Sequence, residues 1–229
     1  MEKDIVCLLI HGFGGGPFEL EALKNRLEED NVTAVDVTLP GHMLDRKALG
    51  QCSYKDWIKA VDEAYQEIAS GVKHQNIYIV GFSMGGLLGS YLASKYAVGC
   101  LVTLNTPIYY WDFRNIIGNL VADIKTGHTE SVKRYMESSF KYPTYSLWNF
   151  RRLLGKTRKS FKEVSCPLLA VQTKDDDAVQ YTSAEYIYNN VKTTDKKLIY
   201  MEDGGHGVLL GEHTDEAVNH IRNFILNHT

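Results

Sequence analysis

The stretch IYIVGFSMGGLLGSYLA, residues 77–93, decides the fold of this chain. It begins as a β-branched apolar run and continues as a helix-like run, which predicts a strand followed directly by a helix. Ser83 stands at the junction, with Gly81, Gly85 and Gly86 around it. This G-x-S-x-G pattern is typical of a sharp, strained turn that projects the serine above a sheet and leaves room only for glycine nearby. The alternative is a glycine-rich packing turn with an incidental serine.

The rest of the chain alternates between strand-like and helix-like segments. Short runs rich in Val, Ile, Leu or Tyr, typical of strands buried on both faces of a sheet, occupy residues 5–10, 32–37, 77–81, 100–104, 168–173 and 197–201. Helical patterns occupy residues 19–28, 53–69, 84–96 and 215–227, and one more helix is expected to begin near Thr182. This alternation predicts a parallel sheet covered by helices on both faces, with functional residues at the carboxyl ends of its strands.

The composition is that of a single folded domain without a strongly charged surface. The 229 residues are 44% apolar and 23% charged, with a formal net charge of −3, which suits one α/β domain. So small a net charge argues against a partner, such as nucleic acid or an anionic membrane, that is recognised through the overall charge of the protein. No apolar run approaches the length of a transmembrane helix, so we expect no stable membrane insertion.

The cysteines and the first residues indicate a reducing compartment. Cys7, Cys52, Cys100 and Cys166 are scattered without a C-x-x-C pair, and all but Cys52 lie in or beside strand-like runs. Buried reduced thiols are therefore expected rather than a zinc site or a disulfide framework. The first residues are acidic and their apolar stretch is short, so we predict no signal peptide and expect a cytoplasmic location.

One long stretch between the strands at 100–104 and 168–173 breaks the alternation. Apolar residues recur there at helical spacing over 113–124, 132–136 and 147–154. Because a structureless loop of such length is uncommon, we predict a core of residues 1–106 and 161–229 and a small helical cap inserted at 107–160. The cap is rich in aromatic side chains, which suit an apolar acyl pocket, although packing between cap and core explains any one of them as well.

A catalytic serine needs a base, and His206 is the candidate. In this architecture the order along the chain is Ser, then Asp or Glu, then His. The segment EDGGHGVLL, residues 202–210, follows the last predicted strand, so His206 lies at the edge of the sheet where Ser83 also lies. Its neighbouring glycines leave it on an open loop from which the ring can reach the serine. A satisfied surface histidine is the alternative.

The orienting acid comes from three consecutive aspartates that follow the strand at 168–173. A single carboxylate can hold the imidazole. We choose Asp176, because the spacing D-x-x-V places Val179 where it can pack below the loop. Asp175 and Asp177 would then face water or cap the following helix. Spacing defines this position to within about a residue or two.

The reaction also needs backbone N–H groups that hold an oxyanion. One donor is expected at Met84, directly after the nucleophile, and the other in the loop after the first strand. That loop reads HGFGGG, residues 11–16, and Phe13 is the natural second donor. A phosphate-binding loop is excluded, because no Gly-Lys-Ser/Thr follows and Pro17 stands where a third glycine is required. His11 is expected to brace the loop rather than to take part in the chemistry.

Together these segments resemble the α/β-hydrolase family of serine hydrolases. The resemblance is carried by LLIHGFGGGPFELEAL (8–23), LPGHMLD (39–45), the stretch 77–93, VQTKDDDAV (171–179) and DGGHGVLL (203–210). Within this family, the chain is most similar to small bacterial carboxylesterases and their monoacylglycerol-lipase relatives, in which the loop that carries the acid has the pattern Q-x-x-x-D-x-x-V. Gln172 precedes Asp176 by that spacing. The resemblance implies an α/β-hydrolase fold with a six-stranded, mostly parallel sheet, flanking helices and a small helical cap.

The resemblance also implies a function. Ser83 would be the nucleophile, Asp176 the orienting acid and His206 the base, with the N–H groups of Phe13 and Met84 as the oxyanion hole. The chain is expected to be a serine carboxylesterase that takes small esters with apolar acyl groups of short to medium length, without a metal or organic cofactor. A monoacylglycerol lipase, a thioesterase or amidase with the same triad, and a catalytically inactive binding protein are the alternatives, and a homodimer is left open.

Overall fold

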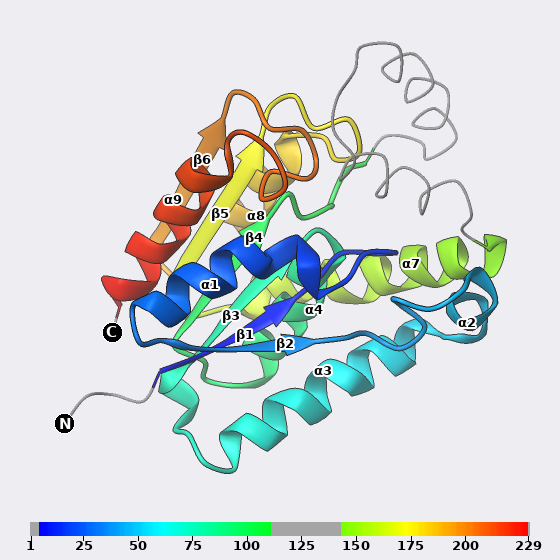
Figure 1. The fold of residues 1–229 in the computed structure, drawn as a ribbon, viewed down its shortest axis with the longest axis horizontal. Coiled ribbons are helices and arrows are strands. Elements are labelled where there is room, and N and C mark those ends of the chain that lie inside the picture. Colours follow the sequence, from blue (N-terminus) through cyan, green and yellow to red (C-terminus); the bar gives the residue numbers. More distant parts are fainter. Residues whose placement is uncertain (1–4, 111–142, 229) are drawn as a thin grey trace.

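The structure is a computed structural model that describes residues 5–110 and 143–228 (Figure 1). Its centre is a single six-stranded sheet in the order β2-β1-β3-β4-β5-β6, and all five strand pairs are parallel. The strands are β1 (Val6–Ile10), β2 (Thr33–Val37), β3 (Ile77–Phe82), β4 (Cys100–Leu104), β5 (Leu168–Thr173) and β6 (Lys196–Met201). The predicted six-stranded α/β sheet is confirmed, and each predicted strand is present to within one residue at either end.

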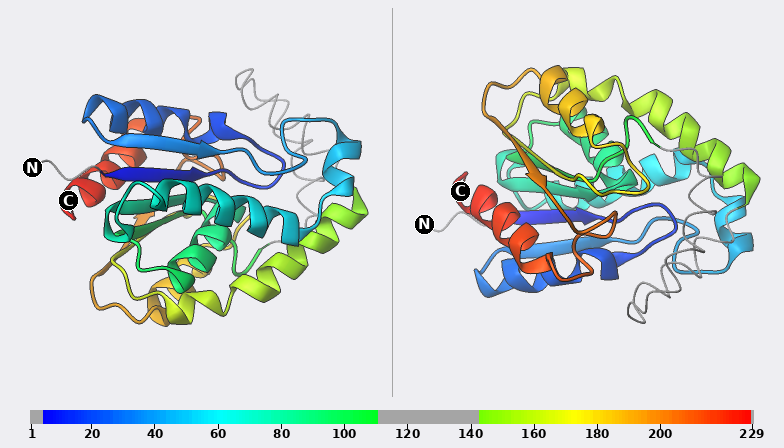
Figure 2. Two further views of the ribbon diagram at one scale, coloured as in Figure 1. Left: turned by 90° about the horizontal axis from the view of Figure 1, so that it is seen from below. Right: turned by 90° about the horizontal axis from the view of Figure 1, so that it is seen from above.

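Helices cover both faces of this sheet (Figure 2). One face carries α1 (Glu21–Glu29) and α9 (Thr214–Leu226), and the other carries α3 (Tyr54–Ala69), α4 (Met84–Lys95), α7 (Thr144–Thr157) and α8 (Thr182–Asn190). Because successive side chains of a strand point to opposite faces, Leu8 and Ile10 enter one apolar cluster while Cys7 and Leu9 enter the other. The sheet is therefore buried on both sides, which explains why its strands read as continuous apolar runs.

Local sequence signals account for where several helices begin. A capping box starts α3, because the backbone N–H of Ser53 donates to the Asp56 carboxylate at 2.8 Å. The short helix α2 (Arg46–Gln51) begins at Asp45, whose side chain accepts from the N–H of Ala48 at 2.8 Å. The sequence pattern gives no sign of α2, since six residues are too few to show a helical period. Short 3₁₀ turns, η1 (Pro17–Leu20), η2 (His74–Asn76) and η4 (Ser160–Glu163), complete the described elements.

The predicted cap falls partly within the described residues. Its apolar pattern over 147–154 forms α7, whereas the patterns over 113–124 and 132–136 lie outside the described residues, so the boundaries 107–160 stay a prediction. In α7 the side chains of Phe150 and Leu153 are buried in the cluster that α4 also enters, while Tyr145 and Trp148 are exposed. Phe150 is thus a packing aromatic, one of the two explanations that the sequence leaves open.

All four cysteines are free, and Cys7, Cys100 and Cys166 are buried as predicted. Cys7 and Cys100 belong to the cluster under α1 and α9, and Cys166 belongs to the cluster on the opposite face. Burial raises the pKa of the Cys7 and Cys166 thiols to about 12. Among the helices of the described segments, none combines the length and apolar character needed to cross a membrane.

Candidate active site

The turn between β3 and α4 places Ser83 at a strained backbone angle. Its φ of 51° and ψ of −116° lie outside the regions that non-glycine residues favour. A Cβ atom on Gly81 would overlap the backbone of Gly85 and Gly86, and one on Gly85 would overlap the carbonyl oxygen of Ile10. Gly81 and Gly85 are therefore required by the close contact of α4 with β3 and β1, which is the geometry that the G-x-S-x-G pattern predicts, whereas a Cβ atom on Gly86 would overlap the Thr106 side chain.

The structure brings the three predicted triad residues together at the carboxyl edge of the sheet. The Ser83 hydroxyl lies 3.0 Å from Nε2 of His206, and Nδ1 of His206 lies 2.9 Å from Oδ2 of Asp176. These side chains follow β3, β6 and β5, and all three residues are buried. With Nδ1–H donating to the carboxylate, Nε2 presents its lone pair to the serine hydroxyl, as a general base requires.

Asp176 is held by its own loop. Its Oδ1 accepts from the backbone N–H groups of Ala178 and Val179, each at 2.8 Å, and its Oδ2 also accepts from Gln172 at 3.2 Å. These bonds orient the carboxylate toward His206, and Val179 is buried, in agreement with its spacing.

The neighbouring aspartates have other surroundings. Asp177 is exposed, as expected. Asp175 is exposed too, but its carboxylate also accepts from the backbone N–H groups of Gly204 and Gly205, at 3.2 and 2.9 Å. Asp175 thus faces water as expected, and its additional partners lie on a loop distant in sequence, which no local pattern shows.

Opposing effects set the pKa of His206. Burial favours the neutral ring and lowers the pKa, but the charge of Asp176 and its hydrogen bond to the ring raise it, and Asp177 and Glu19 add to the rise. The net result is a pKa above the ordinary value of 6.5. His206 is thus more easily protonated than a free imidazole, which suits a group that must accept a proton from serine.

The loop after β1 is braced by His11, as predicted. Its Nδ1 donates to the carbonyl of Gly12 at 2.8 Å, and its Nε2 accepts from the N–H of Leu39 at 3.0 Å. Burial lowers the pKa of His11 to about 4, so the ring is neutral and can make both bonds. Beyond this brace, the ring of Phe13 packs against Trp57 and Phe150, with centroids 5.7 and 5.4 Å apart.

Glu19 is a second support of this loop, and its role is not evident from the sequence. Its carboxyl is buried against Gly15, where a Cβ atom would overlap it, and Oε2 accepts from the N–H of Gly12 at 2.8 Å. Within the described residues, Oε1 has no hydrogen-bond partner. Burial raises the pKa of Glu19 to about 7, against the lowering effect of Gly12, His206 and Gly16. A glutamate in an amphipathic helical pattern reads as exposed, so only the folded structure reveals its position.

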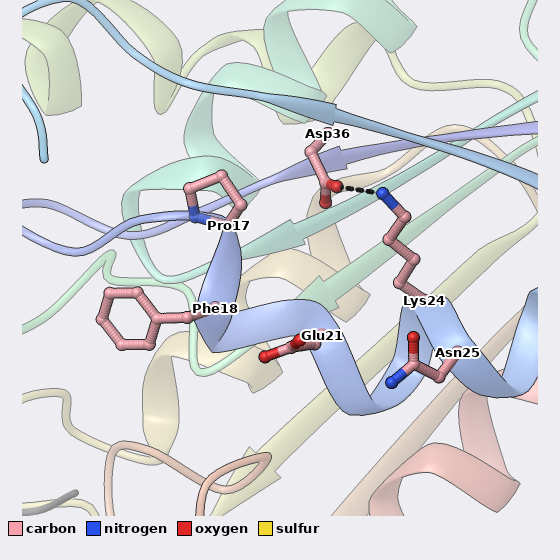
Figure 3. A pocket seen from close by; sticks show the side chains of 6 residues that line it. All are labelled: Pro17, Phe18, Glu21, Lys24, Asn25 and Asp36. Carbon is pink, nitrogen blue, oxygen red and sulfur yellow. Dashed lines mark hydrogen bonds and ion pairs between the residues drawn. The ribbon is translucent and has the colours of Figure 1, made fainter.

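A separate surface pocket of about 330 Å³ lies beside η1, α1 and β2 (Figure 3). The Lys24 ammonium and the Asp36 carboxylate pair across it at 2.6 Å. The residues that line it are Pro17, Phe18, Glu21, Lys24, Asn25 and Asp36. None of these belongs to the triad, so the pocket is distinct from the candidate site. Across residues 5–110 and 143–228, no group of three or more His, Cys, Asp or Glu side chains is arranged to hold a metal ion.

The fold and the site together define a class of protein: a parallel α/β sheet that carries a serine on a strand-to-helix turn, beside a histidine and an aspartate at the same edge. Residues 7–221 match the model described as the alpha/beta hydrolase family. The chain belongs to this family.

Two curated relatives resemble most of the chain. One is the thermostable monoacylglycerol lipase of Bacillus sp. (strain H-257), which is 27% identical over 214 residues, covering 87% of this chain and 81% of that protein. The other is the carboxylesterase of Bacillus subtilis (strain 168), which is 24% identical over 228 residues, covering 97% of this chain and 92% of that protein.

Solved structures show the same fold. A structure from work on LipS and LipT, two metagenome-derived lipolytic enzymes, superposes with a TM-score of 0.83 at 19% identity and covers 99% of this chain and 95% of that one. The monoacylglycerol lipase of Paleococcus ferrophilus superposes with a TM-score of 0.75 at 15% identity and covers 98% and 95% of the two chains. At these identities the likeness concerns the fold alone.

Proposed function

We propose that this protein is a serine carboxylesterase that hydrolyses short- to medium-chain carboxylic esters through an acyl-enzyme on Ser83. The observation that carries the proposal is the continuous hydrogen-bonded chain from Ser83 through His206 to Asp176, with links of 3.0 and 2.9 Å. Membership of the alpha/beta hydrolase family supports it, and so do the two relatives, since both are named as enzymes that act on carboxylic esters.

In the first half of the reaction, the ester carbonyl carbon is attacked by the Ser83 oxygen while Nε2 of His206 takes the hydroxyl proton. The carbonyl electron pair moves onto oxygen and forms a tetrahedral oxyanion. Asp176 stabilises the imidazolium that results, without itself taking the proton. When the oxyanion collapses, the bond to the alcohol oxygen breaks and His206 returns the proton to the leaving alcohol, which leaves the acyl group on Ser83.

Water completes the cycle by the same route. His206 removes a proton from a water molecule as its oxygen attacks the acyl carbonyl, and a second tetrahedral oxyanion forms. Its collapse breaks the bond to Ser83, which recovers its proton from His206, and the carboxylic acid leaves. Only these side chains and water take part in the scheme.

The oxyanion is assigned to the backbone N–H groups of Phe13 and Met84. Met84 opens α4, and the first N–H groups of a helix have no partner within the helix. Phe13 follows Gly12, whose N–H and C=O are fixed by Glu19 and His11. Each such donor supports the transition state by about 3 kcal/mol in comparable sites, so a rigid loop at this point favours catalysis.

Monoacylglycerol lipase activity is the second candidate function. The observation in its favour is the relative that is 27% identical over 87% of this chain, which is named a thermostable monoacylglycerol lipase. The two functions share one triad and differ in the alcohol that leaves, glycerol in one case and a simple alcohol in the other.

The test compares the purified protein with Ser83→Ala on 4-nitrophenyl esters from acetate to palmitate and on a monoacylglycerol. We expect turnover by the wild type alone, with the rate falling for the longest chains. A preference for the monoacylglycerol over every simple ester would favour the lipase. Ser83 labelled by a fluorophosphonate without ester turnover would direct the assay to thioesters and amides, and absence of both labelling and turnover would leave a binding protein.

A further inference from the structure

Asn105 is a strained, fully buried residue at the end of β4, directly beside the candidate site. Its φ of 44° lies in the left-handed region, which few residues other than glycine adopt and which asparagine tolerates best. Its backbone N–H donates to the carbonyl of Val171 at 3.0 Å, which ties it to β5. Backbone strain of this kind persists only where surrounding contacts enforce it, and it gathers at functional sites.

The side-chain amide of Asn105 joins β5 to the loop that carries His206. Its Nδ2 lies 2.8 Å from the carbonyl oxygen of His206 and 3.1 Å from that of Gly205. Its Oδ1 accepts from the backbone N–H of Thr173 at 2.9 Å, and the Thr173 hydroxyl donates to the carbonyl of Gly205 at 2.6 Å. One buried amide therefore binds the backbone of His206 itself to the edge of the sheet.

The His206 loop depends on such contacts. Gly204 and Gly205 have φ values of 129° and 61°, and Gly207 follows the histidine. Glycine at these positions permits the turn but leaves the free loop many conformations. Asn105 and Thr173 hold its carbonyl groups, and Asp175 holds its N–H groups on the other side. Together they hold the loop backbone from which the His206 ring extends.

We propose that Asn105, with Thr173, is a positioning residue that clamps the His206 loop and so aims the imidazole at Ser83. This inference rests on the proposed function, in which His206 is the base. It follows that loss of the clamp lowers kcat, because a base displaced by about 1 Å can cost on the order of a hundredfold in rate. KM stays nearly constant, since Asn105 is fully buried and its amide contacts backbone groups of Thr173, Gly205 and His206.

Two substitutions remove the clamp in different ways. Asn105→Gly deletes the amide but accepts the positive φ, and Asn105→Asp keeps the shape and the acceptor for Thr173 while replacing the donor with an oxygen that faces two carbonyl groups. For both we expect kcat to fall at least tenfold with KM within about twofold of the wild type.

Asn149 supplies the matched control. It is also a buried asparagine whose amide joins two elements, because it accepts from the N–H of Tyr54 at 3.2 Å and donates to the carbonyl of Tyr145 at 3.0 Å. It lies on α7 and makes none of the contacts to the His206 loop. Asn149→Asp is therefore expected to lower stability while kcat, measured on the folded fraction, stays at the wild-type value.

A second readout does not depend on activity. The proton on Nδ1 of His206, bonded to Asp176, gives a low-field proton resonance that reports the position of the ring. We expect this resonance to shift or broaden in both Asn105 variants and to persist in Asn149→Asp. Absence of ester hydrolysis by the wild type would overturn the proposed function, whereas the resonance would still decide whether Asn105 positions the ring.

A wild-type kcat and an unchanged resonance in Asn105→Gly would overturn the proposal. If neither Asn105 variant folds, Thr173→Val tests the same clamp, because it removes the hydroxyl that donates to Gly205 and keeps the side-chain shape. A fall in kcat with a shifted resonance would support the clamp, and no change in either would refute it.

Discussion

At the scale of single residues, His206 ties the proposed catalysis to pH. The base must be neutral, and the Asp176 carboxylate holds the pKa of its ring above 6.5 in spite of burial. We therefore expect kcat/KM to fall as the pH drops, with a midpoint above 6.5. In Asp176→Asn, loss of the opposing charge moves this midpoint to lower pH, and the turned imidazole lowers kcat by about 10⁴. Rates measured between pH 5 and 9 test both statements.

The control for that experiment is Asp203→Asn. This change removes an exposed carboxylate near the same loop and leaves Asp175 and Asp176 in place, so the rate is expected to stay close to the wild-type value. A profile that is flat down to pH 5 in the wild type would contradict the role of His206 as base.

Glu19 ties folding stability to pH in a measurable way. Burial raises its pKa from 4.5 to about 7, so the folded chain holds a proton between these values that the unfolded chain releases. Its contribution is present below pH 4.5 and is lost as the pH rises to 7, by about 1.4 kcal/mol per pH unit. Glu19→Gln has no carboxyl that titrates at this position, so its stability lacks this dependence on pH. The stability of wild type relative to Glu19→Gln should therefore decline between pH 5 and 7, as measured by urea unfolding.

Glu21→Gln serves as the control, because it changes an exposed carboxyl of α1 two residues after Glu19. Parallel stability curves for wild type and Glu19→Gln would show that Glu19 titrates as an ordinary surface glutamate.

At the scale of elements, the apolar periodicity of the sequence was enough to predict the bounds of a helix or strand that is long or is buried on both faces. The strand limits agree to within one residue, and α4 and α9 lie where the helical patterns predict them. The helix predicted at 19–28 divides into η1 and α1, and Glu19 of η1 turns inward to the N–H of Gly12 instead of facing water. That inward turn depends on a contact with a neighbouring segment, which no local pattern records.

The turn between β3 and α4 offers a test of why glycine is needed. Gly85→Ala would force a Cβ atom onto the carbonyl oxygen of Ile10, which is backbone and cannot move aside. We expect this variant to lose several kcal/mol of stability and its activity together. Gly155→Ala in α7 meets nothing within 4 Å, so it should stabilise the chain by about 0.5–1 kcal/mol through helix propensity alone. Denaturant unfolding of the two variants measures both effects.

Equal stability of Gly85→Ala and the wild type would show that the turn can widen. The backbone angles of Ser83 would then not depend on the close contact between α4 and β1.

At the scale of the whole molecule, topology assembles the site. Ser83, Asp176 and His206 are far apart in sequence, yet each follows a strand of one parallel sheet, and the carboxyl ends of parallel strands share an edge. Position in the sheet therefore predicted that Ser83 and His206 would meet an aspartate of the loop after β5, and the spacing to Val179 and Gln172 selected Asp176 among three. The clamp by Asn105 could not be predicted in this way, because one amide joins the end of β5 to the backbone of the His206 loop, and an asparagine at the end of a strand carries no such signal by itself.

The buried thiols make the chain its own reporter of unfolding. Alkylating reagents attack the thiolate, and Cys7, Cys100 and Cys166 are sealed inside with raised pKa values. Pulses of iodoacetamide followed by intact-mass analysis should add one label at the half-buried Cys52 first. We expect the two faces of the sheet to unfold in one step, so the other three labels should appear together as denaturant increases. Cys7 and Cys100 report on one face of the sheet and Cys166 reports on the other. Labelling of Cys166 at a lower denaturant concentration than Cys7 and Cys100 would mean that the helices on its face of the sheet detach before α1 and α9 do. The two apolar clusters would then unfold in separate steps.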